Sequence, residues 1–411
     1  GDSATVINNA VLIGHNAGHT ISTSTGVDGT VGIGAEVLAA LTTGAGNLAI
    51  GFKAGWSLAD DSYNTFLGYQ AGMMAEGGAN AANVYIGYLA GYQLDDGVSN
   101  IAIGREAMES STAGGNDASY NVAIGDRSLE AITDGDKNIC IGFETGKSIT
   151  TGGSNISIGH AASDATTTGA INIAIGNDAL GNNVSGNYMT AVGTNALQYS
   201  GQRGGATANI FAVGIGTQAG AYQTGSYNTF VGDYAGKGSQ TSAPYGSGTA
   251  LTAVGAYALG NTVSGDYNTA VGYNTLSANT TGDTNSAFGK DALKVCTTGT
   301  NNCAIGTRSL QALTTAASNV AVGDLAGGGV TTGANNTFLG TNAGDNVTTG
   351  TDNILIGLNP STSQVDSQRQ IVMGRNVVGA GGDHLTFGDG STDSAIQFGA
   401  TSITAPSDVR Y

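Results

Sequence analysis

A glycine that closes a short apolar run recurs along this chain at a nearly constant interval. It stands at positions 14, 34, 51, 68, 87, 104, 125, 142, 159, 176, 193, 216, 232, 255, 272, 289, 306, 323, 340, 357 and 374. Of the 20 intervals between these 21 glycines, 14 are 17 residues long, and the others run from 16 to 23 residues. Such a period, kept over most of 411 residues, is typical of repeat architectures in which each unit packs only on its neighbours.

Other residue types keep fixed distances from this glycine, which we number 0 within each unit. Ile, Val or Leu stands at position −1 in 19 of 21 units, and Asn stands at position −4 in 15 of 21. Ala occupies +3 in 14 of 21 units, and Gly or Leu usually follows it, ahead of a polar stretch such as Thr331-Thr332-Gly333. Representative pairs at −4 and 0 are Asn47 and Gly51, Asn121 and Gly125, Asn268 and Gly272, and Asn336 and Gly340.

The run from −4 to 0 predicts a β-strand of about four to five residues, because its residues alternate in character. We expect the large −1 side chain to point into the core with the smaller −3 side chain beside it, and −2 to face the other way. The glycine suits a corner or a close approach of two backbones, which a Cβ atom would obstruct. Ala at +3 is the expected inward residue of a second short strand. The Asn side chains at −4 are expected to form a hydrogen-bonded ladder that also satisfies the turn backbone.

These features predict an all-β fold, a β-solenoid or β-roll of about 21 coils of 17 residues over 1–374. Residues 375–411, where the period fades, form a C-terminal transition segment in this interpretation. A helix starting at pieces such as Gly289–Leu293 has only five or six residues before the next turn, too few for stability. Aromatic residues at −2 and +1 are expected on an outer face, which predicts self-association into an intertwined or side-by-side homotrimeric fibre.

Composition excludes several other classes of protein. With 69 Gly, 3 Pro and no Gly at every third residue, the chain is not collagen-like, and apolar residues at fixed positions argue against disorder. The net charge is −17 and the few basic residues are scattered, so we expect no nucleic-acid partner. No apolar run reaches the roughly 18 residues of a membrane span, so no membrane insertion is expected. Because the chain starts at Gly1 and not at Met, we expect a fragment or a processed product.

Candidate sites for chemistry are few. Gly-rich pieces such as Gly32-Ile33-Gly34 are expected from the Gly content alone and do not indicate a nucleotide loop. His15 and His19 straddle a corner, where solvated side chains are favoured over a metal pair. The three cysteines stand at unrelated repeat positions and indicate neither a disulfide framework nor a metal site. We therefore predict no metal, no cofactor and no catalytic residue within the repeat, and the chain is not expected to be an enzyme.

Two binding roles stay open at this point. Acidic turns could hold Ca²⁺ through clustered oxygens, although solvated turn residues are favoured. These turns are Asp60-Asp61, Asp95-Asp96-Gly97, Asp134-Gly135-Asp136 and Asp389-Gly390. Tyr residues at −5 could stack on sugars, although packing beside the Asn ladder is favoured. These residues are Tyr63, Tyr120, Tyr227 and Tyr267.

The repeat resembles two families of surface proteins. The unit Asn121-Val122-Ala123-Ile124-Gly125-Asp126-Arg127-Ser128 resembles the β-roll repeat of trimeric autotransporter adhesin heads, whose repeats are shorter. The run Asn268-Thr269-Ala270-Val271-Gly272-Tyr273 is similar to the long repeat regions of bacteriophage tail-fibre proteins, and this likeness covers about residues 5–375. The resemblance implies a trimeric extracellular fibre.

The last residues of the chain carry a second resemblance. The end Ala405-Pro406-Ser407-Asp408-Val409-Arg410-Tyr411 is similar to the start of the intramolecular chaperone that trims itself from phage tail fibres and tailspikes. In that family a Ser-Asp step is the cleaved bond and a basic residue follows shortly. The resemblance therefore implies an autocleavage junction between Ser407 and Asp408, with Arg410 as the basic residue. A matured chain should end at Ser407, so an uncut junction or a truncated chain is the implied state.

The function expected from these observations is structural. We expect the shaft of a phage tail fibre that extends towards a host cell and attaches to a surface glycan or protein through exposed loops. The longest insertions, at 73–82, 109–120, 198–211 and 237–252, are the expected loops. The alternative is a bacterial extracellular adhesin or matrix filament of the same architecture. An ice-binding role is disfavoured because Thr is not in strict register, and a glycan-degrading role because no unit carries clustered acids.

Overall fold

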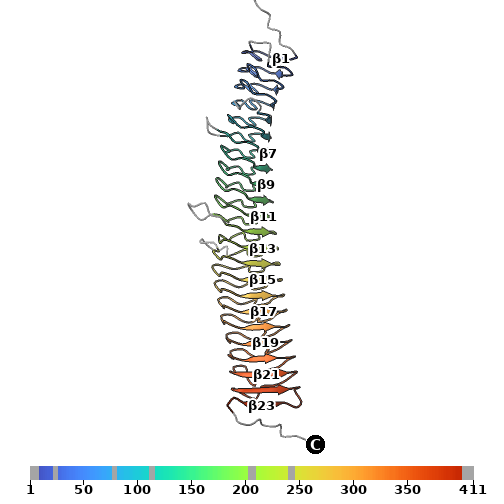
Figure 1. The fold of residues 1–411 in the computed structure, drawn as a ribbon, viewed down its shortest axis with the longest axis vertical. Coiled ribbons are helices and arrows are strands. Elements are labelled where there is room, and N and C mark those ends of the chain that lie inside the picture. Colours follow the sequence, from blue (N-terminus) through green and yellow to red (C-terminus); the bar gives the residue numbers. More distant parts are fainter. Residues whose placement is uncertain are drawn as a thin grey trace, which may run out of the picture. The chain divides into compact units, whose positions relative to one another are not determined.

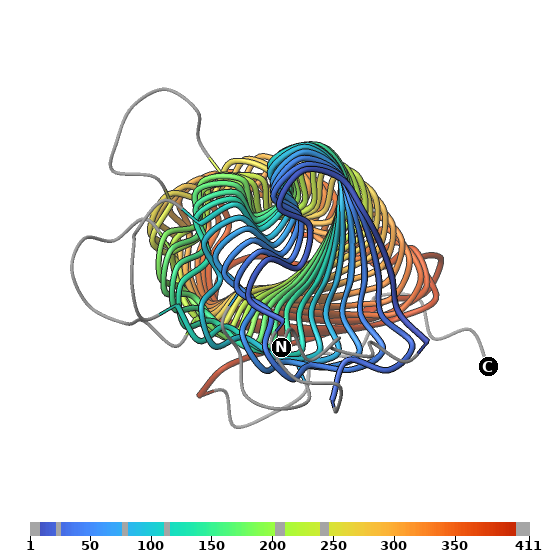
Figure 2. The ribbon, with the colours of Figure 1, turned by 90° about the horizontal axis from the view of Figure 1, so that it is seen from above.

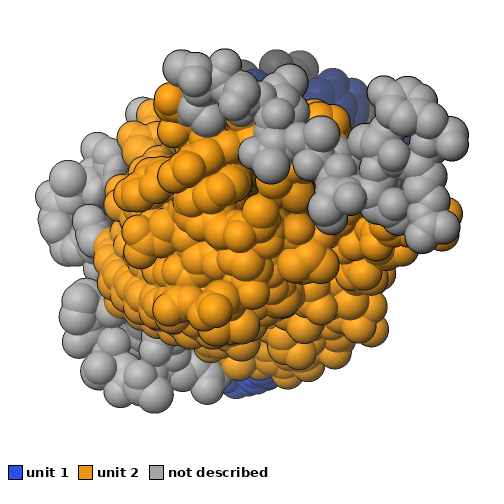
Figure 3. All heavy atoms as spheres, turned by 90° about the horizontal axis from the view of Figure 1, so that it is seen from below, with its two compact units in different colours: residues 1–211 blue, residues 212–411 orange. Residues whose placement is uncertain are grey.

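The chain forms two compact units, residues 1–211 and residues 212–411, in a computed structural model (Figure 3). The structure describes residues 9–21, 26–75, 81–110, 116–201, 210–238 and 246–399. Unit 1 holds β1 (Val11–Ile13), β2 (Val31–Ile33), β3 (Leu48–Ile50), β4 (Thr65–Leu67), β5 (Val84–Ile86), β6 (Ile101–Ile103), β7 (Val122–Ile124), β8 (Ile139–Ile141), β9 (Ile156–Ile158), β10 (Ile173–Ile175) and β11 (Thr190–Val192). Unit 2 holds β12 (Val213–Ile215), β13 (Thr229–Val231), β14 (Thr252–Val254), β15 (Thr269–Val271), β16 (Ser286–Phe288), β17 (Cys303–Ile305), β18 (Val320–Val322), β19 (Thr337–Leu339), β20 (Ile354–Ile356), β21 (Gln370–Gly374), β22 (His384–Gly388) and β23 (Ser394–Gln397).

Within each unit, successive strands pair in parallel, one coil above the next (Figure 1). The pairing keeps the sequence repeat in register, so that Ala270 of β15 lies beside Ala287 of β16. The coils turn gradually along each unit (Figure 2). β23 closes the described part of unit 2 by pairing antiparallel with β22. The described residues contain no helix, and the predicted all-β solenoid of about 21 coils is confirmed.

The inward face of the strand differs from the prediction. In β3, Leu48 is 38% exposed, Ile50 is partly exposed and the central Ala49 is fully buried. The −2 residue therefore faces the core, and the −1 and −3 residues face outward. The reason is the parity of the strand, because the Asn at −4 is buried and −2 shares its face. Ala is common at −2, and the larger β-branched residues of the strand lie outside.

The core is completed by residues from the arc that follows the glycine. Ala at +3 does face inward, as predicted, but its segment is a series of turns and not a second strand. Leu at +4 and the apolar residue at +7, such as Leu129 and Ile132, are fully buried. The −2 aromatics are also buried and not on an outer face, so that prediction was wrong for Phe66, Tyr85, Phe230 and Phe338.

Residue size at −2 and at +4 is complementary within a coil. Ala123 at −2 accompanies Leu129 at +4, whereas Phe66 at −2 accompanies Gly72 at +4. A methyl group at Gly72 would lie 2.7 Å from the Phe66 ring, so the ring fills the space that a leucine occupies in other coils. In most coils, one of these two positions therefore carries a large inward side chain. Where both are small, as at Ala49 and Gly55, a ring of the next coil can fill the space, because a methyl group at Gly55 would lie 2.9 Å from the Phe66 ring.

The glycine at position 0 marks a corner where two backbones meet. Gly340 has φ 128°, and a methyl group there would overlap the carbonyl oxygen of Gly357 in the next coil. The same overlap recurs at the equivalent glycines of both units. A side chain at this position is excluded by the close approach as well as by the backbone conformation.

The Asn residues at −4 form a buried ladder. The Asn302 side chain donates from Nδ2 to Asn285 Oδ1 at 3.1 Å and to the Ala316 carbonyl at 2.9 Å. Asn285 Oδ1 also accepts from the Asn302 backbone N–H at 3.0 Å. Asn302 thus bridges the previous coil and the turn of the next coil, and Asn138, Asn285 and Asn336 make the same contacts. This satisfies buried polar groups that the turn would otherwise leave unpaired.

Candidate binding surfaces

The first candidate surface consists of the outward residues at −3 and −1 of β1–β21, which we call the strand face. Ile, Val, Thr and Leu make up most of it, and none of these residues is charged. Many of its large apolar side chains are substantially exposed, from 36% for Ile173 to 57% for Ile13, and others, such as Ile50, are partly exposed. Parallel sheets are normally covered on both faces. The chain as a whole has a net charge of −17, yet this exposed sheet face has no charged residue. Such an apolar surface is typical of a docking site.

The second candidate surface consists of the residues at +2 and +5, which we call the turn face. In all 21 coils the +2 residue is a non-glycine residue with positive φ, for example Glu36 at 55° and Tyr234 at 55°. This conformation costs roughly 1 kcal/mol or more that glycine would avoid. The side chains retained there are acidic, basic, amide, aromatic or aliphatic. Because buried residues at +4, such as Leu129 with φ 52°, share this conformation, it is a property of the coil. The variety of the exposed side chains at +2 is what makes this face a candidate for recognition.

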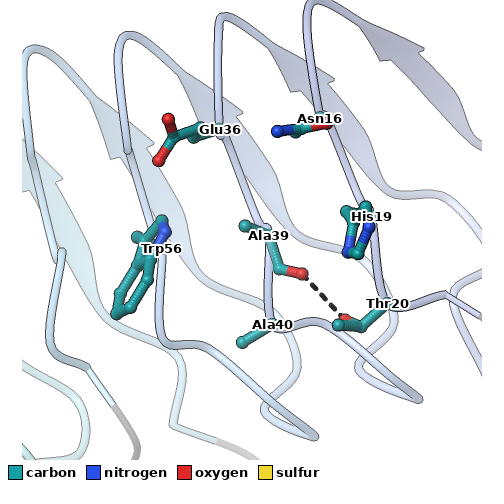
Figure 4. A pocket seen from close by; sticks show the side chains of 7 residues that line it. All are labelled: Asn16, His19, Thr20, Glu36, Ala39, Ala40 and Trp56. Atoms are coloured by element: carbon teal, nitrogen blue, oxygen red, sulfur yellow. Dashed lines mark hydrogen bonds between the residues drawn. The ribbon is translucent and has the colours of Figure 1, made fainter.

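One cavity on the turn face lies in unit 1. It has a volume of about 320 Å³ (Figure 4). Its lining residues come from three successive coils and are Asn16, His19, Thr20, Glu36, Ala39, Ala40 and Trp56. The Trp56 and His19 rings stand on either side of the two alanines. Glu36 forms an ion pair with Lys53 at 3.4 Å, and the Lys53 ammonium lies 5.5 Å from the centre of the Trp56 ring.

A second cavity on the turn face lies in unit 2, with a volume of about 300 Å³. Tyr234 and Tyr257 stack along one side of it, with centroids 5.2 Å apart and planes 4° apart. Lys237 lies 4.6 Å from the Tyr234 ring centre, and partial burial lowers the pKa of its ammonium. The remaining lining residues are small or polar, namely Gly260, Asn261, Asn274 and Ser277. In both cavities the middle coil has Ala or Gly at +5, so a missing side chain makes the hollow.

The turn face also carries a cluster of acidic residues in unit 1. Carboxylate oxygens of Glu106, Glu109 and Glu130 lie within 4.8 Å of one another. Burial raises the pKa of Glu109, and the charges of Glu106 and Glu130 raise it further. Lys147 lies 3.8 Å from Glu130, so the cluster is part of a charge network. Among the described residues, the acidic turns named above do not form a comparable group.

Two of those acidic turns are occupied by hydrogen bonds within the chain. Asp389 Oδ1 accepts from the Ser391 hydroxyl at 2.6 Å and from the Ser391 and Thr392 backbone N–H groups at 2.9 and 3.0 Å, and these bonds lower the pKa of Asp389 to about 2. Asp136 Oδ1 accepts from the Ser119 backbone N–H of the preceding coil at 2.8 Å. These carboxylates act as turn caps in the structure.

The aromatic residues at +1 and −5 lie outside the core. At +1, the Phe52, Tyr69 and Tyr88 rings form a continuous stack with centroids 5.3 and 5.4 Å apart, and all three are exposed as predicted. The four Tyr residues named above at −5 are between 56% exposed (Tyr120) and 65% exposed (Tyr227), and Tyr188, at −5 of another coil, is 44% exposed. The favoured prediction of packing therefore holds only in part, because most of each ring faces solvent.

Most residues singled out from the sequence are structural. The Asn and Gly pairs at −4 and 0 lie inside the coil and at its corner, away from both candidate surfaces. Cys140 and Cys296 are buried, Cys303 is partly exposed, and all three are free thiols. His15 and His19 are exposed, and His19 lines the cavity in unit 1.

Several other predictions fall outside the described residues. Parts of the four insertion loops lie there, at 76–80, 111–115, 202–209 and 239–245. Ser407, Asp408 and Arg410 also lie there. The turn face was missed from the sequence. The sequence feature that could have indicated it is the wide range of residue types at +2 and +5, in a unit whose other positions are regular.

Neither a protein-family model nor a curated protein matches the sequence. In the part of the chain that the structure describes, no helix of a length and hydrophobicity suited to crossing a membrane is present.

Proposed function

We propose that the chain is a structural fibre shaft that assembles with copies of itself through the strand face. The favoured setting is an extracellular phage tail fibre, a homotrimer that extends towards a host cell and attaches to a surface glycan or protein. A bacterial extracellular adhesin or matrix filament is the alternative setting. The observation that carries the proposal is the strand face, because an apolar parallel sheet needs a cover and no other part of the described chain lies on it.

The size of the strand face supports a stable assembly. A face three residues wide and about eleven strands tall measures about 10 by 50 Å, or about 500 Å² in each unit, so the two units together offer about 1,000 Å². A standard protein interface covers about 800 Å² on each partner. The face has the same strand spacing along its length, so it can match a copy of itself over many coils. It also carries no charge, so the net charge of −17 does not oppose contact at that surface directly.

Light scattering of the purified chain tests this assembly. We expect a mass of about three times the 40.5 kDa of one chain. The double variant Ile139→Lys/Ile173→Lys places two charges on the strand face, and we expect it to run as a single chain with an unchanged circular dichroism spectrum, because desolvating unpaired ammonium groups is costly.

The matched control is Asn195→Lys, which adds a charge on the turn face of the same unit and should leave the mass unchanged. A single-chain mass for the unaltered protein at micromolar concentration would contradict the proposal. Electron micrographs of the assembled protein should show filaments, and round particles would count against a fibre.

A further inference from the structure

Rings on neighbouring coils of this protein stack at a fixed spacing. The centroids of Phe52 and Tyr69 are 5.3 Å apart, and those of Tyr234 and Tyr257 are 5.2 Å apart. This spacing follows the separation of paired strands, about 4.8 Å. Equivalent positions on coils therefore form columns in which each ring is one step from the next.

The cavity in unit 1 is a column with one ring missing. His19, Ala39 and Trp56 occupy +5 in three successive coils, so the two rings stand two steps apart, about 10 Å, with only a methyl group between them. Figure 4 shows the open space over Ala39 and Ala40 between these rings. At the centroid spacing of 5.2 to 5.3 Å found in the stacked columns, one planar group fits between the two rings. We call it the ring slot.

The charges around the ring slot select a cation. Trp56 presents an indole, the aromatic side chain that attracts cations best. The Glu36 carboxylate lies at the rim, and the Lys53 ammonium already sits 3.4 Å from Glu36 and 5.5 Å from the Trp56 ring centre. A guanidinium entering the slot would therefore replace Lys53 as the partner of Glu36. The net charge of −17 also favours the approach of cations over anions.

We propose that the ring slot binds the guanidinium group of an arginine side chain on a partner protein. A guanidinium is planar, stacks on aromatic faces and forms paired hydrogen bonds with a carboxylate, whereas an ammonium is a compact point charge that cannot fill a flat gap. The Asn16 side chain adds an amide group at the rim. The inference does not depend on the fibre function, because it concerns the turn face of one chain.

Fluorescence can test the proposal directly, because Trp56 is the only tryptophan in the chain. The probe is Nα-acetyl-arginine amide, titrated into the full chain. We expect a saturable change in Trp56 emission with a dissociation constant on the order of millimolar. Nα-acetyl-lysine amide carries a positive charge but no planar end group. Nα-acetyl-citrulline amide carries a planar urea group but no charge. Both should bind about tenfold more weakly or not measurably.

Two variants separate the slot from general attraction to the surface. Ala39→Phe supplies the missing ring, so it should abolish the response to the arginine probe and preserve the circular dichroism spectrum. Glu36→Gln removes the rim charge and should weaken binding severalfold. Gln311→Phe, at +5 in unit 2, is the matched control and should bind the probe normally. If Ala39→Phe does not fold, Ala39→Leu fills the same space with a smaller group.

Three results would overturn the proposal. Equal responses to the arginine and citrulline probes would show that charge is not recognised. Unchanged binding by a folded Ala39→Phe or Ala39→Leu variant would place the probe elsewhere. A saturable response to methyl glycosides without any response to the arginine probe would assign the slot to a sugar ring instead.

Discussion

Replacing Gly340 by alanine is expected to remove the hydrogen-exchange protection of β19 and β20. The added methyl group would overlap the Gly357 carbonyl oxygen, and the φ of 128° is itself unfavourable for alanine. The backbone conformation alone costs roughly 1–3 kcal/mol. The overlap forces two coils apart along a stacked ladder, so the total should exceed about 4 kcal/mol. Because each coil depends on its neighbours, the damage should spread from this corner.

Hydrogen exchange read by mass spectrometry on peptides covering 337–357 measures this effect. Gly381→Ala is a matched control, because Gly381 has φ 147° but the nearest atom to an added methyl group, His384 Nδ1, is 3.9 Å away. The Gly381→Ala variant has the unfavourable φ but no overlap with a neighbouring coil, so β19 and β20 should stay protected from exchange. Equal protection in the Gly340→Ala and unaltered proteins would show that the corner can open without cost.

The repeat register could be predicted because the residue types that define it, Asn and Gly, fit few other positions in a coil. A buried Asn and a glycine at fixed spacing restrict the backbone strongly, so the coil, its parallel stacking and the Asn ladder follow from counting. The strand face was harder to predict. Hydrophobicity favoured Ile and Val as inward residues, but −2 faces inward, and its residue is often Ala, with Leu at +4 beside it. The decisive observation is that alternate residues of a strand share a face, so −2 lies on the same face as the buried Asn at −4.

The candidate binding surfaces could not be predicted from the repeat. Their residues are those that the repeat leaves free, and only the three-dimensional columns show which of them are neighbours. His19, Ala39 and Trp56 are separated by 20 and 17 residues, and the sequence shows no reason to group them. The positive φ at +2 was also hidden, because most residues there are not glycine or asparagine. A column becomes visible only when coils are stacked in register.

Replacing Phe66 by alanine is expected to destabilise unit 1 by about 3–5 kcal/mol, because it empties a fully buried site. Gly72→Leu alone should also destabilise, since a methyl group at Gly72 would lie 2.7 Å from the Phe66 ring. The double variant Phe66→Ala/Gly72→Leu reproduces the pair found as Ala123 and Leu129. Leu129 has φ 52° and Gly72 has φ 58°, so the backbone already accepts leucine in this conformation.

Guanidinium denaturation followed by Trp56 fluorescence should therefore show the double variant to be more stable than either single variant, with a coupling energy of about 2–3 kcal/mol. Phe52→Ala is the control for ring removal, because Phe52 is 38% exposed and should cost only about 1 kcal/mol. If the free-energy changes of the two single variants add up to that of the double variant, the side chains at −2 and +4 are packed independently. Filling of the core would then not explain why Gly stands at +4 in the four coils that have an aromatic ring at −2.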